Sequence, residues 1–70
     1  MTRFEIYAQT FKLLLENAKK SPFKKAWREL NYLRQGVYGW YLEDQISIRQ
    51  YLYFSRQVDN AMTTIYRNEV

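Results

Sequence analysis

Apolar side chains recur along the first twenty residues with the period of an α-helix. They stand three or four residues apart and share one stripe at about 100° per residue: Phe4, Tyr7, Phe11, Leu14 and Ala18. Thr2 and Glu5 have the spacing of a capping box, and Met1 is placed to pack on Ile6 as a hydrophobic staple. The pattern predicts a helix over residues 3–20.

A second helix follows the dipeptide Ser21-Pro22. Proline is disfavoured inside a helix but suits the first helical position after a serine cap, so this dipeptide ends one helix and starts the next. The apolar stripe that follows contains Phe23, Ala26, Trp27, Leu30 and Leu33. These residues share one face of the helix, which we expect to face the core.

Gly36 and Gly39 leave the end of the second helix open to two interpretations. Either Gly36 is a C-cap and residues 37–46 form a separate short element, or the helix continues through both glycines. Three apolar residues keep the phase of the stripe beyond Gly36: Val37, Trp40 and Tyr41. We therefore favour one helix over residues 22–43, with a kink or a break at the glycines as the alternative.

The third helix has the clearest start signal in the chain. Ser47 and Gln50 form a second capping box, and Ile46 and Tyr51 occupy the two staple positions. Heptad-like spacing follows at Ile48, Tyr51, Ser55, Val58, Met62 and Ile65. The resulting helix over 48–68 has an apolar arc wide enough to touch two other helices, which predicts an all-α, three-helix bundle.

Two polar residues, Ser55 and Asp59, fall within this apolar arc. A buried carboxylate must be paired, so Asp59 is expected to meet a tyrosine hydroxyl or an arginine, or to lie at an edge. A structural hydrogen bond is the simpler expectation, and a functional switch is the alternative.

Composition places the chain among small globular domains. It has 70 residues, of which 47% are apolar and 19% aromatic, so we expect a single packed domain over residues 1–70. The chain contains neither Cys nor His, which removes disulfides and the usual zinc ligands. No apolar run is long enough for a membrane span, and the first residues lack the layout of a secretory signal. We expect a cytoplasmic protein without a membrane partner.

The residue types also argue against an enzyme. Without His and Cys, acid–base catalysis would fall to seven carboxylates scattered along helix faces, and no glycine-rich phosphate loop is present. A bundle of this size has little room for a substrate pocket. We expect no catalytic residue, no cofactor, no metal and no small-molecule substrate.

Positive charge is concentrated around the junction of the first two helices. The net charge is +4, and the basic cluster comprises Lys19, Lys20, Lys24, Lys25 and Arg28, with Tyr32 and polar side chains on the same side. Arg49 and Arg56, seven residues apart, add a stripe on the last helix. Both features fit contacts to nucleic-acid phosphates or to an acidic partner, and both also fit a solvated helix face.

Several apolar residues do not fit the interior of a bundle. Ile6 and Leu13 lie opposite the core stripe of the first helix. Leu13 is expected to form an apolar patch together with three residues on the edge of the last helix: Phe54, Ala61 and Ile65. Trp40 belongs to an aromatic segment, residues 37–42, that fits either the core or a binding hot spot.

These observations lead to two hypotheses. The first is a small, non-enzymatic interaction or regulatory protein that binds another protein and self-associates as a homodimer. Its candidate interface residues are Ile6, Leu13, Tyr32, Trp40, Phe54 and Ile65. The second is a nucleic-acid-binding accessory protein that uses the basic cluster at the helix junction.

Overall fold

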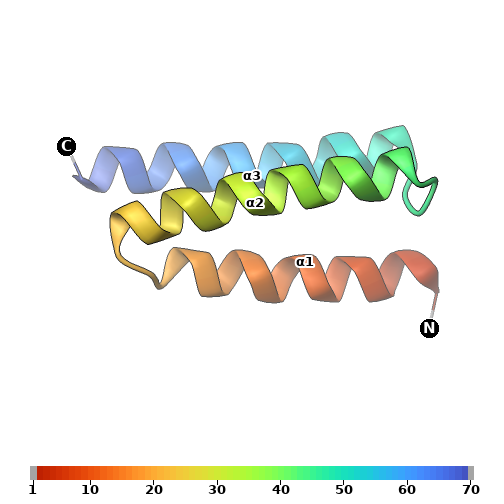
Figure 1. Cartoon of the computed structure of the whole chain (residues 1–70), viewed down its shortest axis with the longest axis horizontal. Helices are drawn as coiled ribbons and strands as arrows, with labels where there is room; N and C mark the ends of the chain where they lie inside the picture. Colours follow the sequence, from red (N-terminus) through yellow and green to blue (C-terminus); the bar gives the residue numbers. More distant parts are fainter. Residues whose placement is uncertain (1, 70) are drawn as a thin grey trace.

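The computed structural model describes residues 2–69 and contains three helices: α1 (Arg3–Lys19), α2 (Phe23–Leu42) and α3 (Ile48–Glu69). Consecutive helices are antiparallel and are joined by short turns at opposite ends of the molecule (Figure 1). The predicted all-α fold with three helices is confirmed, and each predicted boundary lies within about one residue of the observed one.

The start of α1 follows the predicted capping box in part. The Thr2 hydroxyl accepts a hydrogen bond from the Glu5 backbone N–H at 3.2 Å, which satisfies one of the unpaired donors at the helix start. Glu5 in the first turn and Lys19 in the last turn both complement the helix dipole. The predicted packing of Met1 on Ile6 lies outside the described residues.

The start of α2 differs from the prediction that Ser21 caps it. The helix begins at Phe23 with Pro22 as its N-cap residue, and no side chain caps it. The Ser21 hydroxyl instead donates to the Asn17 carbonyl oxygen at 3.2 Å, so it serves the end of α1. The reason is that the preceding helix offers free carbonyl groups within reach of this side chain.

The glycines do not interrupt α2, so the expected continuation is confirmed. The helix ends in a Schellman-type turn, in which the Asp44 N–H donates to the Tyr41 carbonyl and the Gln45 N–H donates to the Trp40 carbonyl. Asp44 has a φ of 60°, the left-handed conformation that is usually occupied by glycine in this motif. The true C-terminal signal of α2 is therefore Asp44 rather than Gly36.

The predicted capping box of α3 forms completely. The Ser47 hydroxyl accepts from the Gln50 N–H at 3.1 Å, and the Gln50 side chain accepts from the Ser47 N–H at 2.8 Å. Ile46, just before the box, is 5% exposed and belongs to the core. This reciprocal pair fixes where the turn after α2 becomes helix again.

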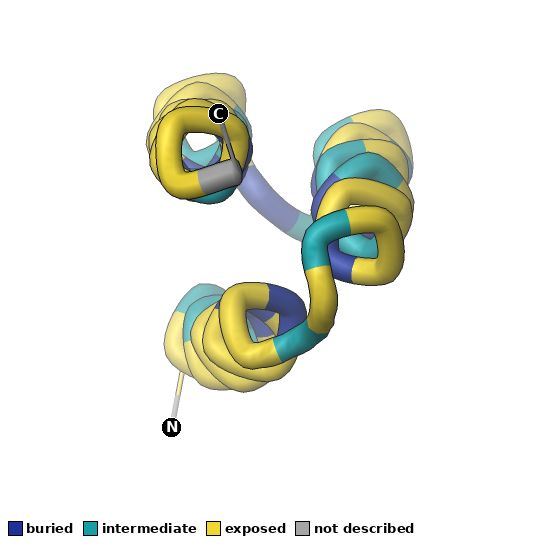
Figure 2. The backbone as a smooth tube through the Cα atoms, turned by 90° about the vertical axis from the view of Figure 1, so that its left-hand side faces the viewer, coloured by how far each residue is buried: buried dark blue, intermediate teal, exposed yellow. Residues whose placement is uncertain are grey.

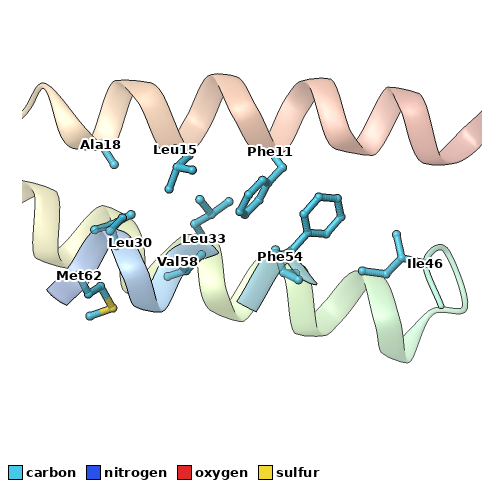
Figure 3. Close-up of a cluster of buried hydrophobic side chains, with 11 residues drawn as sticks. Phe11, Leu15, Ala18, Leu30, Leu33, Ile46, Phe54, Val58 and Met62 are labelled. Carbon is cyan, nitrogen blue, oxygen red and sulfur yellow. The ribbon is translucent and has the colours of Figure 1, made fainter. Parts of the chain in front are cut away.

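The core lies along the common axis of the three helices. Figure 3 shows side chains of α1 pointing towards α2 and α3, with members including Phe11, Leu15, Leu30, Leu33, Phe54 and Val58. Phe54 is central, because its ring lies 4.4 Å from that of Phe11 and 5.7 Å from that of Phe4, measured between centroids. Contacts of this kind between aromatic rings add to the free energy gained by burying their area.

Three residues of the predicted apolar stripes lie at the margin of the core instead. Trp27 is 37% exposed, Leu14 is 46% exposed and Ile48 is 47% exposed. In the end-on view of Figure 2 the helices occupy the corners of a triangle, with exposed positions on their outer sides. Periodicity defines the centre of a stripe, whereas residues at its edges open onto the grooves between helices. No helix among residues 2–69 is long and apolar enough to cross a membrane.

Candidate interaction surfaces

A largely apolar hollow runs between α1 and α2. We refer to it as the α1–α2 groove; it has a volume of about 380 Å³ and is lined by Leu14, Asn17, Glu29, Tyr32, Leu33, Gly36 and Trp40. Its volume lies within the usual range for ligand pockets, roughly 300–1,000 Å³. The groove lies along two helices, so it suits an elongated occupant.

Trp40 is held in place at one end of the groove. Its ring meets that of Tyr7 edge-on at 4.8 Å and that of Phe54 at 6.2 Å. The Tyr7 hydroxyl donates to the Gln45 side chain at 3.2 Å, which ties α1 to the turn after α2. This end of the groove is therefore preformed by packing between all three helices.

The rest of the groove leaves apolar surface open. Leu33 is buried in its floor, whereas Leu14 and Tyr32 are 46% and 65% exposed. Gly36 contributes open backbone, and a Cβ atom built there would have nothing within 4 Å apart from the helix itself. The packing within this chain therefore does not require glycine at position 36. Tyr32 and Trp40, both sequence-derived candidates, are brought together here.

The other apolar candidates do not form the expected patch. Phe54 and Ala61 are 1% and 4% exposed, so the expectation that they border a surface patch with Leu13 is wrong. They face the bundle axis because α3 packs against both other helices, and the middle of its wide arc is covered. Ile6 and Leu13 are exposed as expected, and Ile65 is half-buried against the core.

The basic cluster lies around the turn between α1 and α2. Two of its members make weak ion pairs: Lys19 with Glu16 and Lys25 with Glu29, each at 3.9 Å. The three others, Lys20, Lys24 and Arg28, are exposed. Surface ion pairs at this distance contribute little, so the turn keeps a surplus of positive charge. Arg49 and Arg56 are also exposed, on α3.

The side of α2 and α3 that faces away from α1 carries an ion pair that was predicted only in outline. Arg34 of α2 binds Asp59 of α3 and also contacts the Met62 sulfur at 3.4 Å. Asp59 thus has an arginine partner, and it lies at an exposed edge of the arc rather than inside it, with 59% of its side chain exposed. Ser55 differs, because its buried hydroxyl oxygen has no hydrogen-bond partner among the described residues.

This face is also rich in tyrosine and tryptophan. Tyr38 packs on Tyr51 at 5.8 Å and Tyr41 packs on Tyr51 at 5.3 Å. At the other end of this face, Trp27 and Tyr66 border a hollow that Arg34 and Asp59 also line. The ion pair therefore separates these two residues from the group of three tyrosines. Sequence reasoning found only the part of this face that lies in the aromatic segment 37–42, which contains Tyr38 and Tyr41. A signal for the rest exists: Trp27, Arg34 and Tyr41 are seven residues apart, as are Leu52, Asp59 and Tyr66.

The groove and the face of α2 and α3 are both lined mainly by apolar and aromatic side chains. Among residues 2–69, no three acidic side chains gather in a way that could hold a metal ion. Comparisons of the chain with models of protein families, with curated proteins and with solved structures returned no match.

Proposed function

We propose that this chain is a small, non-enzymatic protein-binding module that docks an amphipathic helix of another protein in the α1–α2 groove. The observation that supports this proposal is the open groove itself, with Leu33 and Trp40 as its floor and exposed Leu14 and Tyr32 along it. Placing an apolar helix face in such a groove is a recurring mode of peptide recognition. The proposal includes a cytoplasmic location, which suits a chain without cysteine.

The lining favours a helix over a small molecule. A small ligand is held by a few polar groups that converge inside an enclosed pocket. Here the lining combines Asn17 and Glu29 with the large side chains of Leu14 and Tyr32, which remain substantially exposed beside the floor. Gly36 adds a position where the backbone of an incoming helix can approach closely. An extended apolar occupant would cover all of these features at once.

Site-specific photo-crosslinking tests whether the groove is occupied. A photoreactive phenylalanine derivative at position 32 reports on the groove, and the same derivative at position 53 is the matched control. Tyr32 and Tyr53 are both exposed, at 65% and 57%, but Tyr53 lies on α3 outside the groove. We expect a defined adduct from position 32 whose partner peptide has apolar residues at helical spacing. Equal crosslinking from both positions would contradict the proposal.

Two neighbouring leucines allow a quantitative test, in which the affinity of each variant for the purified captured partner is measured. Leu14 lines the groove, whereas Leu13 lies on the outer side of α1, and both are exposed, at 46% and 65%. Leu14→Glu should weaken binding at least about tenfold by placing a charge in an apolar contact. Leu13→Glu should leave the affinity nearly unchanged. A larger effect at Leu13 would move the interface to the outer face of α1, with Ile6.

The second candidate function is binding to nucleic acid through the basic cluster. Its support is the exposed group Lys20, Lys24 and Arg28 beside the two weakly paired lysines. Counterion release predicts a steep loss of affinity for random duplex or single-stranded oligonucleotides as salt is raised. Absence of binding at low salt would eliminate this candidate, and unchanged binding of Lys24→Glu would argue against this surface.

A further inference from the structure

A second surface of this protein is independent of the groove. It lies on the side of α2 and α3 opposite α1, and we refer to it as the aromatic face: Trp27, Tyr38, Tyr41, Tyr51, Leu52 and Tyr66. Four of these residues are 37–57% exposed in the single chain. Tryptophan and tyrosine are the residue types that dominate binding energy in protein interfaces, and exposed apolar patches of this kind mark contact sites.

The aromatic face has a symmetric layout. On α2 the order is Trp27, Arg34, Tyr41, and on α3 it is Leu52, Asp59, Tyr66, with a spacing of seven residues throughout. The ion pair between Arg34 and Asp59 thus lies midway along both lines. A face whose two halves are apolar and whose centre is polar can meet an identical face about a two-fold axis through that centre.

The charges at the ends of α2 indicate the relative direction of the two copies. Lys24 and Lys25 stand in its first turn, where the helix dipole favours acidic residues, and Glu43 and Asp44 follow its last residue, where it favours basic ones. Both ends therefore oppose the dipole of their own helix. In an antiparallel pair, the lysines of one copy would lie beside the acidic residues of the other, whereas a parallel pair would bring two basic turns together.

The size of the face reaches the lower end of what a specific dimer needs. α2 has 20 residues and is therefore about 30 Å long, and two neighbouring helices of about 10 Å diameter each give a face of roughly 600 Å². Specific interfaces bury about 600–1,000 Å² per partner. The face is therefore large enough for specific pairing when it is covered along its whole length.

We infer that two copies of this chain form an antiparallel homodimer through the aromatic face, α2 against α2 and α3 against α3. The two-fold axis passes between the two Arg34–Asp59 pairs. Trp27 of one copy then faces Tyr41 of the other, and Leu52 faces Tyr66. At the centre of the interface each Arg34 keeps Asp59 of its own chain as its partner. The α1–α2 grooves stay open on the outer sides of the dimer.

Sedimentation equilibrium on the full chain, from low to high micromolar concentration, tests the dimer with two matched leucines. Leu52 and Leu13 are 54% and 65% exposed, on the aromatic face and on the outer side of α1 respectively. Leu52→Glu should raise the dimer dissociation constant at least about tenfold, because each interface then contains two buried charges. Leu13→Glu should change it by less than about twofold. Circular dichroism checks that both variants keep their helix content.

A charge exchange tests the antiparallel direction. Lys24→Glu alone should weaken the dimer severalfold by facing Glu43 and Asp44 of the second copy, and the added change Glu43→Lys should restore most of the affinity. Lys24→Glu alone also improves the match to the dipole of α2 within each chain. A weaker dimer together with an equal or higher free energy of unfolding of the monomer therefore indicates that Lys24 acts between the two copies. A strictly monomeric protein, equal effects at Leu52 and Leu13, or no restoration by the exchange would each overturn the inference.

Discussion

Helices α1 and α2 border the same groove, but their ends are built in opposite ways. α1 starts with a hydrogen bond to the Thr2 side chain and carries Glu5 in its first turn and Lys19 in its last. α2 starts at Phe23, its N-cap residue Pro22 provides no side-chain cap, and the helix has no acidic residue in its first turn and no basic residue in its last. In α1, local sequence preferences and the dipole agree with the fold, whereas in α2 they do not.

The difference shows where the stability of α2 comes from. Its inner face is fully buried, with Ala26, Leu30 and Val37 at 0–1% exposure. The packing of α2 against both α1 and α3 holds it in place, although it contains two glycines and has unfavourable charges at its ends. Departures from local rules tend to gather where a protein binds something, and α2 contributes to both the groove and the aromatic face.

The largest expected effect comes from the glycines inside α2. The double substitution Gly36→Ala and Gly39→Ala should raise the free energy of unfolding by up to about 2 kcal/mol, because each glycine costs roughly 1 kcal/mol in a helix relative to alanine. Both sites have free space around an added Cβ atom, so no clash offsets the gain. Urea unfolding in dilute solution measures it. A loss of stability would show that α2 is not a regular helix at these positions.

Measuring the affinity for a partner helix distinguishes the roles of the two glycines. Gly36 lines the groove and Gly39 does not. Gly36→Ala should therefore weaken docking of a partner helix while it stabilises the fold, whereas Gly39→Ala should stabilise without changing affinity. Equal affinities for both variants would mean that no backbone approaches Gly36.

The cap of α1 gives the next largest effect. Thr2→Ala should lower the free energy of unfolding by about 1 kcal/mol, since the Glu5 N–H loses its acceptor. Thr10→Ala is the matched control, because the Thr10 hydroxyl only donates to the Ile6 carbonyl within the helix and should contribute little. Thermal unfolding followed by circular dichroism compares the two. Similar effects from both would argue against the cap.

The turn that ends α2 should respond in the opposite direction. Asp44→Gly should raise the free energy of unfolding by about 1 kcal/mol, because Asp44 occupies a left-handed conformation and adds negative charge at a helix C-terminus. Urea unfolding of the single variant measures the gain. If stability falls instead, the Asp44 side chain contributes an interaction that outweighs its backbone strain.

The smallest effect concerns the first turn of α2. Lys24→Glu should stabilise the monomer by roughly 0.3–1 kcal/mol through the helix dipole, and the gain should shrink as salt is added. Lys12→Glu makes the same charge change in the middle of α1, where the dipole has little influence. The comparison is best made at low protein concentration, where the inferred dimer is dissociated. An equal gain at Lys12 would indicate that net charge is responsible.

The sequence predicted the architecture well because its local signals are strong and independent of tertiary contacts. The capping box at Ser47 and Gln50 depends only on residues three apart, and it forms with both hydrogen bonds. The continuation through Gly36 and Gly39 followed from the unbroken phase of the apolar stripe. Ser21 shows the limit of such signals, since its hydroxyl had a second acceptor at the end of the preceding helix.

The surfaces were harder to predict, because periodicity does not say how three stripes are oriented around one another. Phe54 was placed at the edge of a patch and is among the most buried residues, whereas Trp27 was placed in the core and is 37% exposed. The contact of Arg34 with Asp59 joins residues on different helices, so no spacing rule could identify the partner. Only the packing of α3 against both other helices settles these positions.

The two tryptophans would make intrinsic fluorescence a reporter of two separate events. Trp40 is half-buried and packs against Tyr7 and Phe54, so its emission should shift to longer wavelength when α1 separates from the other helices. Trp27 lies on the aromatic face beside Phe23, at 5.9 Å, and is still partly in contact with water. Its emission should shift to shorter wavelength as a second copy covers it. Single Trp→Phe variants would assign each signal, so that folding and pairing can be followed in one sample without an added label.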